Sequence, residues 1–125
     1  MINFTIFLPP ITKKNSQQIL LNKRTNRPFI MPSAKFLKYE KDCKPFLPIL
    51  SKPIDYPVTI KCLYFMPTRR KCDLTNLLEA TDDILVNSNI LSDDNYSIIA
   101  SHDGSRVFYD KLNPRTEIFI EPFIN

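Results

Sequence analysis

Glycine is almost absent from this chain: its 125 residues include one glycine, one histidine and no tryptophan. A single glycine excludes the glycine-rich loops that cradle nucleotide phosphates, so we expect no nucleotide cofactor. Cysteine is scarce as well, because Cys43, Cys62 and Cys72 stand far apart and form no CxxC pair. Three scattered cysteines and one histidine do not make a structural zinc site. We expect reduced thiols that pack as small apolar groups.

Long apolar runs are also missing, and no stretch is apolar enough to span a membrane. Residues 1–7 alternate between apolar and polar side chains, which is typical of a strand and not of a signal peptide with a basic start. We therefore expect a cytoplasmic protein with no membrane partner. With 43% hydrophobic residues, the chain 1–125 is expected to fold as one domain around one core.

Charge is distributed unevenly along the chain. Residues 1–72 hold 14 Lys/Arg and 3 Asp/Glu, a net charge of +11. Residues 73–125 hold 3 Lys/Arg and 10 Asp/Glu, a net charge of −7. A basic half beside an acidic half suits a nucleic-acid-binding surface next to a metal site. The alternative is that the charges are segregated by accident over a solvated surface.

Hydrophobic periodicity predicts two main helices in a small α+β (mixed α/β) domain. Ser33 is the expected cap of the first helix, which carries apolar residues from Phe36 to Leu47 at helical spacing. The expected cap of the second helix is Asp73 or Thr75. Its expected buried stripe is Leu77, Leu78, Thr81, Ile84 and Leu85.

Alternating and β-branched runs predict the strands. Two short apolar runs on either side of Asn22–Arg27 are expected to pair as a hairpin-like arm. The tight-turn signal Asp103-Gly104 predicts a hairpin between residues 96–102 and 105–109. We expect a mixed sheet of about four to five strands that carries the two helices. The strands of the sheet are expected at 2–8, 58–66, 96–102, 105–109 and 116–121.

One stretch contains most of the residues suited to chemistry. The cations Arg69–Lys71 are followed closely by Asp73. A short helical pattern then carries Glu79 and Asp83, and Asp93-Asp94 follows. Because a strand–helix–strand unit can return the chain to the same edge of a sheet, we expect Asp73 and Asp94 to meet there. Convergent carboxylates can hold Mg²⁺, with Mn²⁺ as the alternative ion, beside a phosphodiester that the cations bind.

Each of these acidic residues also has a purely structural interpretation. Asp73 could simply cap the helix, and Asp83 could pair with one of the two arginines before it. Glu79 and Asp82 could belong to a solvated helix face. Asp93-Asp94 could form no more than a turn. The cations immediately upstream favour the chemical interpretation of the group as a whole.

Other polar residues could complete a site. His102 could act as a general base, or it could end a hairpin. Lys13, Lys14, Asn15 and Ser16 offer donors for phosphate oxygens, although the same segment could be a solvated loop. The chain has no Ser/His/Asp or Cys/His arrangement for nucleophilic catalysis.

In their order and spacing these motifs resemble the RusA family of Holliday junction resolvases, which is common in phages and prophages. The resemblance implies a homodimeric, magnesium-dependent endonuclease with a small α/β fold, which cuts paired strands of a four-way DNA junction in recombination and repair. It covers nearly the whole chain and is most specific in residues 69–94. The matching segments are Pro9-Pro10, Lys14-Asn15, Arg69-Arg70, Asp73-Leu74-Thr75-Asn76, Asp83-Ile84-Leu85 and Asp93-Asp94.

Two positions depart from the family pattern. Thr75 stands where the family usually has a second metal aspartate, and Glu79 stands where it usually has a catalytic lysine. Because these two residues lie four apart on a helix, our hypothesis is that Glu79 restores the missing carboxylate. The lysine's charge would then come from Arg69, Arg70, Lys71, Arg106 or Lys111. The expected site comprises the catalytic residues Asp73, Glu79, Asp83 and Asp94, the metal ligands Asp73, Glu79, Asp93 and Asp94, and the DNA-binding residues Lys13, Lys14, Asn15, Arg69, Arg70, Lys71, Asn76 and Arg106.

Two other functions compete with a junction endonuclease. One is a non-catalytic, structure-selective DNA-binding protein on the same fold, since a usual metal ligand is missing. The other is a metal-dependent phosphohydrolase that acts on nucleotides. The basic half of the chain favours a polymer over a mononucleotide, because cations spread over many positions imply many phosphates.

Overall fold

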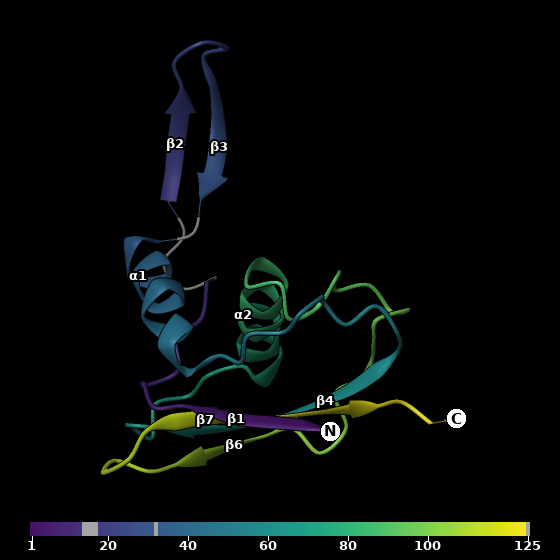
Figure 1. Cartoon of the computed structure of the whole chain (residues 1–125). Coiled ribbons are helices and arrows are strands. Elements are labelled where there is room, and N and C mark those ends of the chain that lie inside the picture. Colours follow the sequence, from purple (N-terminus) through teal and green to yellow (C-terminus); the bar gives the residue numbers. More distant parts are fainter. Residues whose placement is uncertain (14–17, 32, 125) are drawn as a thin grey trace.

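The protein forms a mixed sheet with both helices on one face, and a separate two-stranded arm projects beyond them (Figure 1). This computed structural model describes residues 1–13, 18–31 and 33–124. The five-stranded sheet and two helices confirm the predicted small α+β domain. In chain order the elements are β1 (Ile2–Ile6), β2 (Gln18–Asn22), β3 (Arg27–Met31), α1 (Ala34–Cys43), the short 3₁₀ helix η2 (Lys44–Phe46), β4 (Val58–Met66), α2 (Leu74–Asn87), β5 (Ile99–Ser101), β6 (Arg106–Tyr109) and β7 (Arg115–Pro122).

Strand β4 is the centre of the sheet and has the predicted bounds. It pairs antiparallel with β7, which pairs antiparallel with β1. Side chains alternate along β4 between the helix-covered face and the open face, as a strand with one face in the core requires. Its inward residues Val58, Ile60, Cys62 and Tyr64 are buried. They form one core with buried residues of β7 and both helices.

Helix α2 lies on this core through the stripe that its periodicity predicted, with one exception. Leu77, Thr81, Ile84 and Leu85 are buried as expected. Leu78 is only partly buried, and Ala80 takes its place in the core. The helix therefore has a well-packed inner face, while the face carrying Leu78 is partly open.

Tyr64 fixes the position of α2 over the central strand. Its buried hydroxyl lies 3.0 Å from the Leu77 carbonyl oxygen and 2.6 Å from Oγ1 of Thr81. The Thr81 hydroxyl also lies 3.0 Å from the same carbonyl. A buried hydroxyl is costly unless it is hydrogen-bonded, so these contacts satisfy two polar groups and align the helix on β4.

Helix α1 begins where the sequence predicted. Oγ of Ser33 accepts a hydrogen bond of 3.0 Å from the backbone N–H of Phe36, which confirms the predicted cap. Phe36, Tyr39 and Cys43 are buried. Leu37, predicted on the same stripe, is 40% exposed, because the three buried residues already define a narrower face.

The predicted hairpin between residues 96–102 and 105–109 is wrong. β5 and β6 do not pair with each other in the sheet; each pairs with β4 and runs parallel to it. Leu63 of β4, for example, lies opposite Arg106 of β6. The two short strands therefore follow one another along the same edge of β4, and the β4–α2–β5 segment is the predicted strand–helix–strand unit.

A turn at Gly104 shifts the chain along this edge instead of reversing it. The Ser105 N–H donates to the His102 carbonyl at 3.1 Å, and Gly104 has a φ of +86°, which favours glycine. Between β5 and β6, where strand pairing is interrupted, side chains contact the backbone groups of β4. Nδ1 of His102 lies 3.0 Å from the Ile60 carbonyl oxygen, and Oγ of Ser105 accepts from the Cys62 N–H at 3.0 Å.

The remaining predictions about the fold concern the arm and the thiols. β2 and β3 pair antiparallel around the turn after Asn22, which confirms the predicted hairpin-like arm. All three cysteines are free thiols. Burial raises the pKa of Cys43 to about 11 and that of Cys62 to about 12, so both behave as small apolar groups, as expected. Within the described ranges, no helix is both long and apolar enough to cross a membrane.

Candidate active site

The outer face of α2 forms one wall of a depression of about 260 Å³. Residues three, four and seven positions apart lie on one face of a helix, so Thr75, Glu79 and Asp82 share this wall. The other walls come from the segment before β5 and from the turn after it. The lining residues are Thr75, Leu78, Glu79, Asp82, Asp94 and His102.

Asp94 reaches this depression because the chain after α2 is hydrogen-bonded to the connection before β4. The Ile54 N–H donates to the Ile90 carbonyl, and the Ser92 N–H donates to the Ile54 carbonyl, both at 2.9 Å. Asp94 follows two residues later on an exposed segment. Oδ1 of Asp93 accepts from the Asp94 N–H at 2.7 Å, so this neighbouring carboxylate is bonded to the backbone and does not line the depression.

His102 and Asp82 form a hydrogen-bonded pair at the base of the site. Nδ1 of His102 faces the Ile60 carbonyl oxygen, which can only accept, so Nδ1 carries a proton. Nε2 of the same ring lies 3.0 Å from Oδ2 of Asp82. A hydrogen bond at Nε2 then requires a proton between the imidazole and the carboxylate. The pair therefore holds one proton more than a neutral histidine beside an ionised aspartate.

The pKa shifts of the pair agree with this geometry. Burial raises the pKa of Asp82, the hydrogen bond and charge of His102 oppose that rise, and the negative charges of Asp94 and Asp83 add to it. Burial lowers the pKa of His102, but the hydrogen bond and charge of Asp82 and the bond to Ile60 outweigh it, so the net shift is upward. Both groups thus bind a proton more tightly than they would in water.

The second oxygen of Asp82 is buried without a hydrogen-bond partner among the described residues. Such an oxygen costs free energy unless a donor or cation meets it. Within the same part of the chain, no three Asp, Glu, His or Cys side chains form a ready-made metal cage. Mg²⁺ is usually held by one or two carboxylates, with waters and substrate phosphates completing its shell. The carboxylates of this depression fit that requirement.

The acidic residues predicted from the sequence fall into two groups. Glu79 and Asp94 line the depression, whereas Asp73, Asp83 and Asp93 do not. Asp73 occupies the cap position of α2, but its side chain makes no capping hydrogen bond; instead its Oδ2 lies 3.4 Å from Nδ2 of Asn76. Asp73 therefore stands at the predicted cap position, but the alternative that its side chain caps the helix is wrong, and Thr75, the other expected cap, lies inside the helix.

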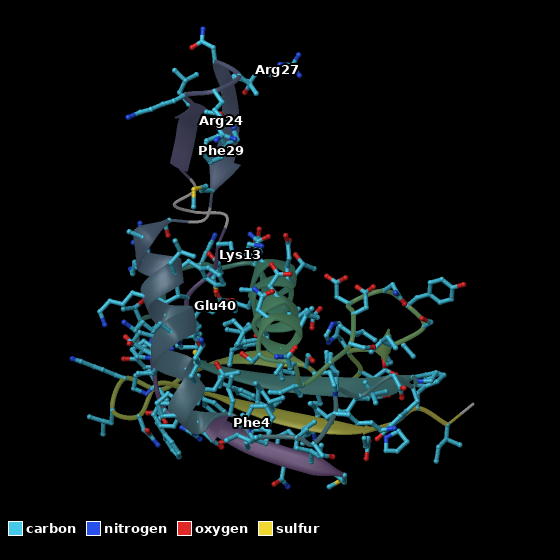
Figure 2. All side chains as sticks on the ribbon, turned by 45° about the horizontal axis from the view of Figure 1, so that its top comes forward. Phe4, Lys13, Arg24, Arg27, Phe29 and Glu40 are labelled. Atoms are coloured by element: carbon cyan, nitrogen blue, oxygen red, sulfur yellow. The ribbon has the colours of Figure 1, made fainter. Side chains whose placement is uncertain are left out.

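Asp83 makes a contact that the sequence did not predict. Its carboxylate forms an ion pair with Nζ of Lys13, not with one of the two arginines before the helix. Lys13 lies beside α2 in Figure 2. Because both side chains are only about a quarter exposed, this pair joins the segment before the arm to the helix that carries the candidate site.

The predicted DNA-binding residues occupy several surfaces. Arg69, Arg70 and Lys71 are exposed just before α2, and the guanidinium of Arg69 lies 4.1 Å from the centre of the Tyr109 ring on β6. Arg106 is exposed at the start of β6, and Asn76 lies in the first turn of α2. Lys14 and Asn15 lie outside the described residues.

Asp82 is the residue that the expected site omitted. Its spacing of three from Glu79 and seven from Thr75 was a usable signal, because it places all three side chains on one helical face. Its partner His102 lies twenty positions later, beyond the reach of helical periodicity. Only the return of the chain along β4 brings the imidazole to this face.

The His102–Asp82 pair predicts a pH-dependent contribution to stability. Relative to the native protein, the His102→Gln variant should lose the most free energy of unfolding at pH values below 6.5, the ordinary pKa of histidine. Because the folded-state pKa is raised, the stabilisation is complete below that value and declines as the pH rises through the folded pKa. Urea unfolding of both proteins with a chelator present, at about pH 6 and about pH 9, measures the difference. A difference in free energy that is equal at both pH values would contradict the protonated pair.

The groups in and around the depression are of the types that bind cations and anionic substrates. It combines carboxylates, an imidazole that holds a proton, and exposed cations on the adjoining segment. These groups suit hydrolysis of a phosphodiester better than chemistry on an apolar substrate. In comparisons with known proteins, no family model and no curated protein matches this chain.

Proposed function

We propose that the protein is a magnesium-dependent endodeoxyribonuclease that resolves four-way DNA junctions by paired nicks, working in the cell as a homodimer. The observation that carries this proposal is the depression on α2, in which Glu79, Asp82 and Asp94 converge beside His102. The unpartnered oxygen of Asp82 supports a role in cation binding, since the described residues supply no donor for it.

The charges around the depression support a polymeric substrate. Arg69–Lys71 are exposed just before α2, and Arg106 is exposed at the start of β6. Cations spread over separate segments match successive phosphates of a strand, whereas a mononucleotide would need them clustered around one point. A junction is favoured among DNA structures by the resemblance of residues 69–94 to the resolvase pattern. A homodimer would supply two equivalent sites for two symmetric nicks.

In this proposal each group has a defined task. Asp82 and Asp94, with Glu79, would hold Mg²⁺, which when bound neutralises phosphate charge and lowers the pKa of a water molecule. The cations of Arg69–Lys71 would hold the scissile strand. His102 holds a proton at Nε2 next to Asp82, within the same depression, and would donate that proton to the leaving oxygen as the phosphodiester opens, which leaves the imidazole neutral.

The deciding experiment is cleavage of a synthetic four-way junction with Mg²⁺ or Mn²⁺, beside a linear duplex of the same sequence. Symmetric nicks in the junction alone are expected. Tight junction binding without nicks, under both metals, would instead identify a DNA-binding protein on this fold that lacks catalysis. Equal behaviour toward junction and duplex would contradict junction selectivity, and hydrolysis of mononucleotides alone would contradict the polymeric substrate.

A further inference from the structure

The outer half of the β2–β3 arm contains the longest unbroken run of exposed residues in the described chain. Every residue from 21 to 29 is exposed, including apolar Leu21 at 57% and Phe29 at 40%. Both figures show the arm projecting from the body beyond the start of α1 (Figures 1 and 2). Its strands pair only with each other and add nothing to the five-stranded sheet. An ordered hairpin that lies outside this sheet and has an exposed tip is positioned to contact another molecule.

The charge of the arm has one sign. Lys23, Arg24 and Arg27 lie at or beside its turn, and all three are exposed. No Asp or Glu occurs in the sequence before Glu40, so the arm and its flanking segments contain no intrinsic counter-charge. A projecting surface with cations alone is complementary to a polyanion.

The turn holds these cations in a fixed arrangement. Oδ1 of Asn22 accepts hydrogen bonds from the N–H groups of Arg24, at 2.9 Å, and Thr25, at 3.3 Å. The Asn26 N–H donates to the Asn22 carbonyl at 2.7 Å, and Asn26 has a φ of +57°, which asparagine tolerates better than most residues. Because the backbone is already ordered, binding through these side chains loses less conformational entropy than binding through a flexible loop.

We propose that the β2–β3 arm binds the phosphate backbone of duplex DNA next to the segment held at the candidate active site. Each strand of the arm has five residues, so it extends for about 17 Å, comparable to the rise of about five base pairs. Its tip can therefore contact phosphates beyond the reach of Arg69–Lys71. This inference rests on the proposed function only in taking DNA as the polyanion.

The ion pair between Lys13 and Asp83 relates the arm to the candidate site. Lys13 precedes the arm, and Asp83 is the neighbour of Asp82 on α2. The chain that leads into the arm is thus fastened to the helix that lines the depression. A duplex lying across α2 would contact the cations Arg69–Lys71 just before that helix and the cations at the tip of the arm.

The test compares two variants with the same change in charge. The tip variant is Lys23→Gln/Arg24→Gln/Arg27→Gln. The control is Lys41→Gln/Lys44→Gln/Lys52→Gln, which removes exposed lysines at the end of α1 and in the connection after it. Affinity for a linear duplex of mixed sequence is measured at several salt concentrations, with a chelator to prevent cleavage. All six positions are exposed, so neither variant should disturb the core.

The tip variant should lose about tenfold or more in duplex affinity at low salt. The slope of its log affinity against log salt concentration should fall in magnitude by about 2 to 3, since each lost phosphate contact removes about 0.9. The control should lose less on both counts. Equal losses in the two variants would overturn the inference. Unchanged DNA affinity with a changed oligomeric state, measured by sedimentation, would also overturn it, because a second copy would then be the partner of the arm. Failure of the native protein to nick junctions, with the tip effect intact, would count against the proposed function alone.

Discussion

The Asp94→Asn variant should cleave a four-way junction at least about 100-fold more slowly than the native protein, while binding it as tightly or more tightly. Asp94 is the residue after α2 that lines the depression, where its charge also raises the pKa of Asp82. Replacing it with the isosteric amide removes one of the carboxylates proposed to hold the cation, with little change in side-chain volume. Binding should not weaken, because a negative charge near DNA phosphates is lost. Single-turnover cleavage and gel-shift titration measure the two effects separately.

Asp93→Asn is the matched control for this experiment. It removes the same charge one residue away, but Oδ1 of Asp93 accepts from the backbone N–H of Asp94, and an asparagine oxygen can keep that bond. The cleavage rate of the control should stay within a few-fold of the native rate, because substitutions of exposed residues usually have small effects. Equal losses in both variants would mean that local charge, and not the position of Asp94, governs cleavage.

The same assay decides which carboxylate compensates for Thr75. Glu79 and Asp82 both line the depression, four and seven residues after Thr75. Full metal-dependent cleavage by Glu79→Gln would refute the hypothesis that Glu79 restores the missing ligand. A loss in Asp82→Asn alone would assign that role to the residue whose second oxygen has no hydrogen-bond partner in the described chain.

Replacing Leu77 with alanine should lower the free energy of unfolding by about 2–5 kcal/mol. The side chain is 1% exposed on the inner face of α2, and the carbonyl of the same residue accepts from the Tyr64 hydroxyl. The substitution removes apolar contacts and leaves a cavity between the helix and β4, which the surrounding core fills only in part. Denaturant unfolding followed by circular dichroism gives the change directly.

Leu112→Ala provides the comparison for this prediction. Leu112 is 95% exposed in the connection before β7, so its truncation should change stability by no more than about 0.5 kcal/mol. A loss under about 1 kcal/mol in Leu77→Ala would contradict its place in the core. A reduced slope of the free energy of unfolding against denaturant concentration would point instead to a change in the unfolded state or in cooperativity.

Local features of this protein were predictable because neighbouring residues determine them. β4 has the bounds 58–66 given by its β-branched run, and Ser33 caps α1 as its residue type favours. The arm around Asn22–Arg27 forms as expected, since its turn is satisfied by its own side chain and backbone. The spacing along α2 placed Thr75 and Glu79 on one face, and the structure places both in one depression.

Non-local pairing was not predictable from the same signals. The Asp103-Gly104 turn forms, but a turn signal does not reveal which strand edge will accept the following residues. α2 crosses over the sheet and leaves an edge of β4 open, and both β5 and β6 hydrogen-bond to it. The pairing with β4 outweighs the local preference for a hairpin, because β4 is long and already anchored in the core.

The sequence by itself determined the elements of this protein and its division into a basic and an acidic half, since periodicity and charge are properties of the chain. Tertiary structure decided which acidic residues share a site. It brought His102 to Asp82 and paired Asp83 with Lys13. These contacts join residues 20 and 70 positions apart, which is beyond the reach of any local sequence pattern.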